Sequence, residues 1–466
     1  MSAENYDVVI IGGGPAGMSA ASILAEHSVK TLLIDENGRL GGQLWRSSAE
    51  AAGTSGIIDS SNDRVNLLAT TGYRNGSLRI QSPACVLGIF PDKSLLLSTK
   101  AEGIKEIKAH NIIFATGARE KVRPFKGWTL PEVMTVGGAQ LLLKNYHVLA
   151  ASEMLVSGTG PLIYLLCGDV LSRGGRISAL LDRSSFMGVL GVTRLMRGQL
   201  SKFGQGLSSF SSMLKGKVLP RYRTQIVKAE SKGGLIEATT RKILPDGSMI
   251  NGSSQRFKTQ MIAVTNGFVG NIELAQVGGC NLDYSLDKGG WFVTVDSAMQ
   301  TSVNGMYAAG ELTGVAGGSK AMVEGQLAAL SILQQSERIS NDDFENRQKP
   351  LLVNRTRYQR FGAYLNRQWA IPGKEWDSID DDTMICRCED ITLGKLRSWI
   401  KAGFTSPSVI KNATRCSMGN CQGRTCGPLI YDILAAYAPA EHSAPFSTRI
   451  PVKPVPLGDL AQMCSE

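Results

Sequence analysis

The sequence lacks the features that would place it in a membrane, an oxidising compartment or a histidine-based active site. No apolar run reaches the roughly 18–20 residues that a membrane-spanning helix needs. A secretory signal begins with a basic region ahead of its apolar run, and the start of this chain has no such region. Only four histidines occur, at positions 27, 110, 147 and 442, and none has a recognisable acid–base setting. We therefore expect a cytoplasmic protein, associated with a membrane at its periphery at most, and the sequence identifies no catalytic residue.

The basic charge of the chain is not concentrated in a way that predicts nucleic-acid binding. The formal net charge is +10, but no basic run carries interleaved aromatic residues. This excess of positive charge favours binding to a partner whose surface is anionic. With 466 residues, of which 52 are glycine and 43% apolar, the chain is long enough for two or three domains of an α/β enzyme.

A glycine turn near the start of the chain has the pattern of a dinucleotide site. An apolar strand leads into Gly12-x-Gly14-x-x-Gly17, and an alanine-rich helix follows. These glycines allow the tight turn, the approach of a pyrophosphate and close packing of helix on strand. The next apolar strand ends in Asp35 and Glu36, about twenty residues on, where an acid can bind a ribose hydroxyl.

A second strand-turn-helix carries Gly158 and Gly160 as candidate contacts of a second nucleotide. The third glycine of the fingerprint is replaced by Ile163, whose side chain would crowd the helix against the strand. The following strand ends in Asp182-Arg183, which fits neither a ribose hydroxyl nor a 2′-phosphate alone. The pattern predicts a Rossmann-type fold and favours a retained scaffold, or a different nucleotide, over NAD(P).

Five of the nine cysteines lie between Cys386 and Cys426. A C-x-C pair is followed after 32 residues by a C-x4-C pair, Cys421 and Cys426, with Cys416 as a fifth thiol. Such thiolates suit zinc or an iron–sulfur cluster. Zinc knuckles commonly use C-x2-C pairs, which neither pair matches. A disulfide or purely structural cluster is the remaining alternative. No C-x-x-C occurs in the rest of the chain, so disulfide reduction is not expected.

Three further segments resemble motifs of thioredoxin-reductase-like flavoproteins: Gly41-Gly42-Gln43, Ala115-Thr116-Gly117, and Thr301-Ser302 leading to Gly310-Glu311. The resemblance implies that Glu311, where aspartate is commoner, accepts a hydrogen bond from a ribityl hydroxyl of FAD. A helix beginning near Ser319 would point its N-terminus at the flavin. The FAD-binding residues predicted in this way are Gly12, Gly14, Pro15, Ala16, Gly17, Asp35, Glu36, Gly42, Gln43, Ala115, Thr116, Gly117, Gly310, Glu311, Ser319 and Ala321.

The cysteine pattern resembles the bacterioferritin-associated-ferredoxin-like (BFD-like) domain, whose four cysteines hold a 2Fe–2S centre. By position the resemblance implies Cys386, Cys388, Cys421 and Cys426 as the metal ligands. Cys416 is either a small buried thiol beside the cluster, which we favour, or an alternative ligand.

Over nearly its whole length the chain resembles the large flavoprotein (α) subunit of heteromeric amino-acid dehydrogenases. That group includes the A subunit of opine oxidase, the B subunit of hydrogen cyanide synthase and the α subunits of hydroxyproline and proline dehydrogenases. The resemblance implies an α/β fold with two Rossmann-type domains, as in thioredoxin reductase, and a small helical 2Fe–2S domain. The implied parts are an FAD-binding domain at 1–118 and 262–335, an inserted NAD(P)-binding-like domain at 119–261, a connector at 336–382, a BFD-like domain at 383–440 and an extended tail at 441–466.

In that family the amine is oxidised on a glycine-oxidase-like β subunit with its own flavin, often with a small ferredoxin-like γ subunit. The resemblance therefore implies an FAD- and 2Fe–2S-containing electron-transfer subunit that feeds an acceptor of respiratory type. Two alternatives stay open: a self-contained NAD(P)H-dependent FAD oxidoreductase and a non-catalytic assembly subunit. A second nucleotide near Gly158, NAD(P) or ATP, or an FMN at a subunit interface, also stays open.

Overall fold

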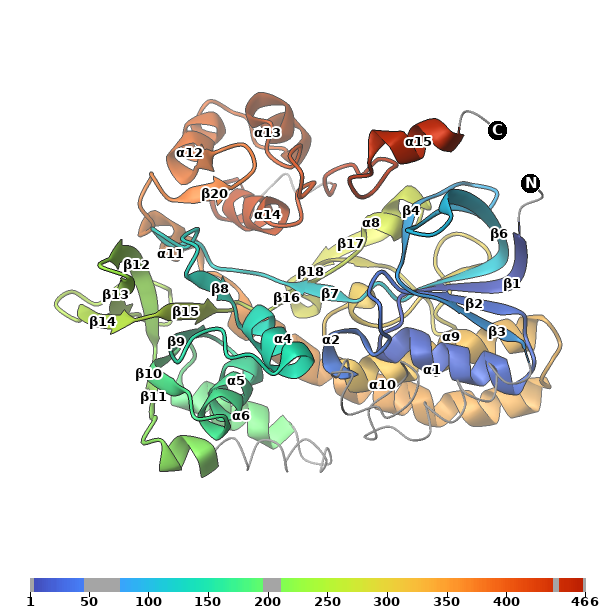
Figure 1. Ribbon diagram of the computed structural model, residues 1–466, viewed down its shortest axis with the longest axis horizontal. Helices are drawn as coiled ribbons and strands as arrows, with labels where there is room; N and C mark the ends of the chain where they lie inside the picture. The colour runs from blue at the N-terminus through green and yellow to red at the C-terminus, as the bar shows by residue number, and fades with distance from the viewer. Residues whose placement is uncertain (1–3, 46–75, 196–210, 439–443, 464–466) are drawn as a thin grey trace. The chain divides into compact units, whose positions relative to one another are not determined.

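The structure, a computed structural model, describes residues 4–45, 76–195, 211–438 and 444–463 (Figure 1). The chain divides into two compact units. The first contains residues 1–119, 269–363 and 447–466, and the second contains residues 120–268 and 364–446. The segment 336–382, expected as a connector, is divided between the two units at position 363/364.

The first unit is built on a seven-stranded sheet with the order β3-β2-β1-β6-β5-β4, in which β19 also pairs with β6. The strands β1, β2, β3, β6 and β19 run parallel. At one edge, β5 pairs antiparallel with β6, and β4 pairs antiparallel with β5. Their bounds are β1 (Glu4–Ile11), β2 (Thr31–Ile34), β3 (Leu78–Gln81), β4 (Ala84–Ile89), β5 (Ser94–Thr99), β6 (Gly103–Phe114) and β19 (Met306–Ala308).

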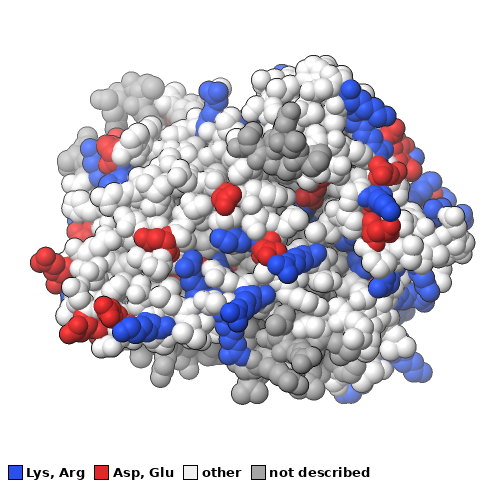
Figure 2. Space-filling model, turned by 180° about the vertical axis from the view of Figure 1, so that it is seen from behind, with Lys and Arg blue, Asp and Glu red and all other residues white. Residues whose placement is uncertain are grey.

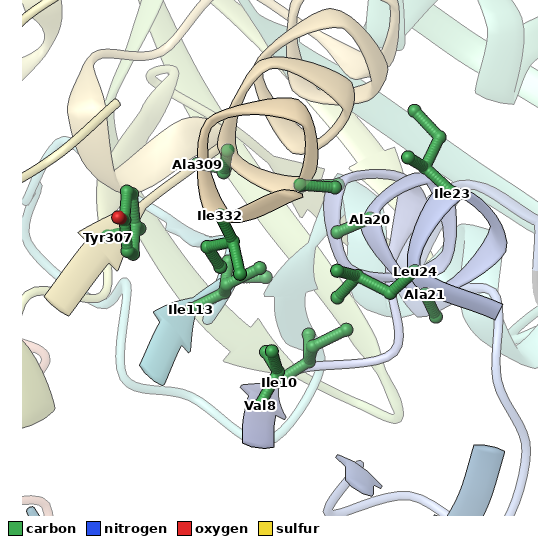
Figure 3. Packing of buried hydrophobic residues seen from close by; sticks show 14 of the residues in the cluster. Val8, Ile10, Ala20, Ala21, Ile23, Leu24, Ile113, Tyr307, Ala309 and Ile332 are labelled. Carbon is green, nitrogen blue, oxygen red and sulfur yellow. The ribbon is translucent and has the colours of Figure 1, made fainter. Parts of the chain in front are cut away.

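Both faces of the central strand β1 are buried, as expected for a parallel sheet covered on two sides. Val8 and Ile10 face the helices α1 (Pro15–Glu26) and α9 (Gly318–Gln335), together with Ile113 of β6. Figure 3 shows these side chains packed between the two helices and the sheet. Val9, on the opposite face, packs in a second apolar cluster.

The remaining elements of the first unit surround this sheet. They are α2 (Gly42–Trp45), α8 (Glu273–Val277), β17 (Leu282–Ser285), η3 (Leu286–Lys288), β18 (Gly290–Val293), η4 (Glu311–Thr313), the first part of α10 (Asn341–Trp369) and α15 (Leu457–Met463). The segment before α15 packs on this unit, because Val452 is buried and its N–H donates to the carbonyl oxygen of Leu87 at 2.8 Å. β7 (Ala118–Glu120) and β16 (Phe268–Gly270) pair where the chain passes between the units.

The second unit contains a five-stranded parallel sheet with the order β11-β10-β9-β15-β8. It is a Rossmann-type arrangement, in which strands on the two sides of β9 wind in opposite directions. Its elements are β8 (Val133–Thr135), α4 (Val136–Tyr146), β9 (Glu153–Gly158), α5 (Pro161–Ser172), β10 (Arg176–Asp182), α6 (Phe186–Leu195), β11 (Pro220–Tyr222) and β15 (Met261–Val264). An antiparallel sheet of β12 (Thr224–Lys232), β13 (Leu235–Lys242) and β14 (Gln255–Thr259) completes it.

A small, mostly helical domain with its own apolar core belongs to the second unit. Its elements are β20 (Met384–Cys386), β21 (Ile391–Thr392), α12 (Leu393–Lys401), α13 (Pro407–Thr414) and α14 (Cys426–Tyr437), preceded by α11 (Gly373–Asp377). Side-chain hydroxyls of Thr392 and Ser406 accept hydrogen bonds from backbone N–H groups at the starts of α12 and α13.

None of the helices in the described ranges is both long and apolar enough to cross a membrane. On the face drawn in Figure 2, lysine and arginine side chains lie among aspartate and glutamate side chains.

Candidate functional site

The turn between β1 and α1 forms a cradle at a helix N-terminus that has no side-chain cap. No side chain caps α1, and Pro15 occupies its first position, so the N–H groups of Ala16 and Gly17 have no intrahelical acceptor. Gly12 has φ +113°, and a Cβ there would lie 2.2 Å from the carbonyl oxygen of Ala115. A Cβ on Gly17 would lie 1.9 Å from the carbonyl oxygen of Gly12. The turn can therefore form only with glycine at these positions, and it leaves a helix N-terminus ready for a pyrophosphate.

The second predicted FAD motif lies against this same turn. A Cβ built on Gly310, which has φ +95°, would be 3.2 Å from the Cβ of Ala16 and 3.5 Å from that of Ala321. A Cβ on Gly42 would be 2.9 Å from the Cα of Gly14. The structure thus brings four separate segments together at the N-termini of α1 and α9, as a flavin dinucleotide site requires.

The acids that follow β2 have different surroundings. Asp35 is buried, and its carboxylate accepts hydrogen bonds from the N–H of Gly13 at 2.7 Å and from the N–H of Asn37 at 2.8 Å. Glu36 is exposed and forms an ion pair with Lys453 from the C-terminal segment. Burial lowers the pKa of Lys453, with the charge of Asp35 acting in the opposite direction. Asp35 therefore fixes the glycine turn, and Lys453 lies beside the two acids expected at the adenosine ribose.

Glu311 directs its carboxylate to the loop that starts α9. It accepts the N–H of Gly317 at 2.8 Å and that of Ala316 at 3.2 Å. Burial raises the pKa of Glu311, while Lys320 and these hydrogen bonds act to lower it. A carboxylate has room for further donors, so these contacts are compatible with the ribityl role expected of Glu311.

Sequence analysis did not detect a buried ion cluster under the second FAD motif. Lys320 donates to the carbonyl oxygens of Gly310 at 2.9 Å and Gly314 at 2.7 Å. Glu324 accepts the N–H of Gly310 at 2.9 Å and pairs with Lys320 and Arg355, each at 2.9 Å. This cluster of three side chains fixes the backbone that carries Gly310. The only signal in the sequence was the i, i+4 spacing of a lysine and a glutamate, which is usually a surface pair.

The Ala115-Thr116-Gly117 segment is held by a residue that sequence analysis also missed. The Thr116 hydroxyl donates to the carbonyl oxygen of Asn271 at 2.6 Å, and the side-chain amide of Asn271 donates back to the carbonyl oxygen of Thr116 at 2.9 Å. Gly117 has φ +71°, and its carbonyl oxygen accepts the backbone N–H of Asn271. The structure leaves Gln43 exposed and Ser319 half-buried near the cradle, and it places Gly158 and Gly160 in the other unit.

Five thiols come together in the small helical domain. The thiol of Cys386 is hydrogen-bonded to those of Cys416 and Cys426, which lowers the pKa of Cys386 well below its usual value. Cys421 is hydrogen-bonded to Cys426 and Cys388, and these bonds lower its pKa as well. Cys388 is exposed, whereas Cys416 is fully buried.

The proximity of these thiols bears on which metal they could hold. In the described part of the chain, no group of three or more His, Cys, Asp or Glu side chains is arranged to hold a metal ion as it stands. A zinc site needs four donors around one point. A 2Fe–2S centre needs four thiolates divided between two irons, and five neighbouring sulfurs fit that requirement.

Three arginines belong to the segments that carry the cysteines. Arg387 lies over the ring of Trp128, and Arg424 donates to the carbonyl oxygen of Cys421 at 3.4 Å. Arg415 pairs with Glu389 at 3.0 Å, so part of its charge is already balanced. The helices α12 and α14 supply most of the apolar core beneath the cysteines.

Two protein-family models match the chain. Residues 6–162 match pyridine nucleotide-disulphide oxidoreductase, and residues 384–436 match the BFD-like 2Fe-2S binding domain. The second match covers all five clustered cysteines. The predicted combination of a dinucleotide-binding flavoprotein fold with a C-terminal 2Fe–2S domain is confirmed.

Curated relatives match over almost the full chain. The A subunit of opine oxidase from Rhizobium meliloti (strain 1021) is 30% identical over 479 residues, covering 98% of this chain and 99% of that protein. Hydrogen cyanide synthase subunit HcnB of Pseudomonas protegens is 30% identical and covers 96% of each chain. Among solved structures, L-proline dehydrogenase from P. horikoshii has a TM-score of 0.67 at 20% identity, over 99% of this chain and 80% of that chain.

Proposed function

The chain belongs to the family of the opine oxidase A subunits, and on that premise we propose that it is the electron-relaying subunit of a heteromeric amino-acid or opine dehydrogenase. It is an FAD-dependent oxidoreductase whose cofactors are FAD and a 2Fe–2S centre. In the proposal, a glycine-oxidase-like β subunit with its own flavin oxidises a CH–NH donor. This chain receives the electrons and delivers them to an acceptor of respiratory type, with or without a ferredoxin-like γ subunit.

The carrying observation is that one chain combines a dinucleotide-binding flavoprotein domain with a BFD-like 2Fe–2S domain. When bound, FAD takes up two electrons and can release them singly, and a 2Fe–2S centre carries one. His27 follows the C-terminal end of α1, about 18 Å along the helix from the cradle. His110 and His147 are exposed. The sequence identifies no catalytic residue in this chain, and we assign the oxidation of the amine to the partner.

The chain's own residues act in this proposal by binding and orienting. The turn from Gly12 to Gly17 binds the pyrophosphate, and Glu311 fixes the ribityl chain. The N-terminus of α9 stabilises the negative charge of the reduced ring. Cys386, Cys388, Cys421 and Cys426 hold the irons, and the buried surroundings of Cys386 and Cys426 limit the access of water.

The test is to purify the chain anaerobically, alone and co-expressed with its partner, and to screen amino acids and opines as reductants. We expect no amine-dependent flavin bleaching with the chain alone. With the partner present we expect bleaching, followed by the electron paramagnetic resonance signal of a reduced 2Fe–2S centre. Turnover of an amine by the isolated chain would refute the division of labour.

A matched variant separates relay from assembly. Cys421→Ser in the complex should leave amine-dependent flavin reduction in place and abolish transfer to a one-electron dye. Cys167→Ser removes a buried thiol of the five-stranded-sheet core and should change neither step. If Cys421→Ser transfers electrons as fast as wild type, the cluster is not on the electron path.

A further inference from the structure

The second unit has a crevice where a sheet of its kind binds a nucleotide. In the order β11-β10-β9-β15-β8, the direction of winding reverses between β9 and β15. Nucleotides bind outside the carboxyl ends of the strands at such a reversal. The two walls here are the turn Gly158-Thr159-Gly160 after β9 and the turn Thr265-Asn266-Gly267 after β15.

The indole of Trp369 fills this crevice. A Cβ on Gly160 would lie 3.0 Å from the indole Nε1, and a Cβ on Gly267 would lie 2.3 Å from the ring atom Cδ2. The Nε1–H donates to the carbonyl oxygen of Thr159 at 3.0 Å. The carbonyl oxygen of Trp369 accepts from the side-chain amide of Asn266 at 2.9 Å. Trp369 is 9% exposed, so the ring occupies the space that the glycines leave open.

The two residues at the end of β10 are also engaged within the unit. The carboxylate of Asp182 accepts the Tyr164 hydroxyl at 2.6 Å and the N–H of Ser184 at 2.8 Å, and it is fully buried. Arg183 donates to Gln225 and Asn266, each at 3.1 Å. The side chains of Asp182 and Arg183 therefore bind internal partners and not a ribose hydroxyl or a 2′-phosphate of a nucleotide.

A carboxylate from the same segment as Trp369 forms ion pairs with two arginines. Glu375 of α11 is fully buried and forms ion pairs with Arg183 and with Arg123. Both arginine side chains are 7% exposed. Glu375 thus provides the negative charge that a nucleotide phosphate would bring to Arg183.

The next residue connects this contact to the cluster domain. Trp376 is fully buried in the apolar core that also contains Cys386, Cys416 and Cys426. Adjacent residues of one short helix therefore enter the nucleotide-type domain and the cluster domain of the same unit.

We propose that the nucleotide crevice of the inserted domain has become an internal socket for the segment 369–376. Trp369 replaces the ligand at the glycine turn, and Glu375 replaces its phosphate at Arg183. The domain therefore binds no NAD(P)H or adenine nucleotide and instead anchors the 2Fe–2S domain. This inference goes beyond the proposed function and requires no partner subunit, so either can fail without the other.

The first test uses the wild-type holoprotein. Isothermal titration with NADH, NADPH, ATP and ADP should show no saturable binding up to about 1 mM. Anaerobic NADH should leave the flavin oxidised. Hydrogen exchange of the amides at the start of α5 should be slow without nucleotide and unchanged by ADP at that concentration, because the segment already covers them. Saturable binding of any of these nucleotides, or ADP-dependent protection, would overturn the proposal.

The second test opens the socket. Trp369→Ala combined with Glu375→Gln should bind ADP at least roughly tenfold more tightly than wild type, and should make the segment between 363 and 384 more sensitive to protease. Trp399→Ala removes a half-buried tryptophan of the cluster domain that packs on Phe404 and should bind no ADP. A folded double variant that gains no affinity would show that the segment does not block the site. If the double variant does not fold, the hydrogen-exchange measurement on the wild-type protein decides whether the segment covers the start of α5.

Discussion

Lys320 and Glu324, one turn apart on α9, bind the two backbone polar groups of Gly310: the lysine donates to its carbonyl oxygen, and the glutamate accepts its N–H. Their charged atoms lie 2.9 Å apart, and the two side chains are 1% and 0% exposed. The second FAD motif is therefore fixed from beneath by an ion pair that is shielded from solvent. Loss of Glu324 removes the paired carboxylate of the buried Lys320, and loss of Lys320 leaves the buried Glu324 with Arg355 as its remaining ion-pair partner.

Replacing Lys320 by Met should destabilise the protein strongly. Breaking a buried pair costs about 3–5 kcal/mol, which corresponds to a fall in melting temperature on the order of 10 °C. Flavin content should fall as well, because Gly310 loses a support. Lys349→Met is the matched control, since Lys349 forms an i, i+4 pair with Glu345 that is exposed on both sides. That change should cost at most about 1 kcal/mol. Equal effects of the two substitutions would contradict the role of Lys320.

The contribution of Glu324 should depend on pH in a defined direction. Burial raises its pKa, but Lys320 and Arg355 outweigh burial and hold the pKa below the usual 4.5. A lowered folded-state pKa means that the stabilisation is complete above pH 4.5 and is lost as the pH falls through the folded-state value. The difference in melting temperature between wild type and Glu324→Gln should therefore be constant between about pH 6 and about pH 8, and should shrink at lower pH. A difference that grows on acidification would refute this assignment.

The parts of the site that depend on local sequence could be predicted, and those that depend on distant contacts could not. Gly12, Gly14 and Gly17 indicate their turn because strand, turn and helix are consecutive in the chain. Trp369 and the glycine turn that it fills are 210 positions apart in sequence. Nothing near Trp369 indicates that its ring will enter a nucleotide crevice, because an aromatic residue in a helix is normally a core residue.

The buried ion pairs could not be predicted from the sequence for a related reason. Lys320 and Glu324 have the spacing of a solvent-exposed helix pair, and only the fold places their side of α9 against the backbone of Gly310. In the same way, Asp182 and Arg183 occupy the positions of a nucleotide-reading pair, and the structure turns both to internal partners. Residue type and spacing drew attention to these positions, but they could not show which partner each charged side chain would meet.

Replacing Gly325 by Ala should weaken FAD binding. A Cβ at this position of α9 would lie 2.1 Å from the carbonyl oxygen of Ala16, which belongs to the backbone of α1. The middle of α9 and the start of α1 would have to move apart, at a cost of roughly 1–3 kcal/mol, and the pyrophosphate cradle would widen. The ratio of flavin to protein absorbance after gel filtration measures the loss. Gly458→Ala in α15 has no neighbouring atom within 4 Å of the new Cβ and should retain full flavin.

Replacing Lys453 by Ala should loosen the C-terminal segment and the adenosine end of the FAD site together. Lys453 pairs with Glu36, and the N–H of nearby Val452 donates to Leu87 of β4. Without the ammonium group, Asp35 and Glu36 lose their nearby positive charge, and we expect faster FAD release and faster proteolysis after position 446. The control is Lys374→Ala. Lys374 is an exposed lysine that pairs with Asp246, and both residues belong to the second unit. Unchanged FAD release in Lys453→Ala would show that the segment is not part of the cofactor site.

The last prediction concerns the role of Cys416, which decides how the five thiols share two irons. Cys416 is fully buried and hydrogen-bonded to both Cys386 and Cys426, so we expect it to donate to the cluster's sulfur ligands without binding iron. Cys416→Ser should then retain iron and sulfide while raising the reduction potential, because a hydroxyl donates a stronger hydrogen bond that favours the more negative, reduced cluster. Cys416→Ala should retain the cluster and lower the potential. Cys388→Ser and Cys421→Ser should lose most of the iron. If instead Cys416→Ala loses the cluster and Cys388→Ser keeps it, the buried thiol is a ligand and the exposed one is not, and the ligand set by position is wrong.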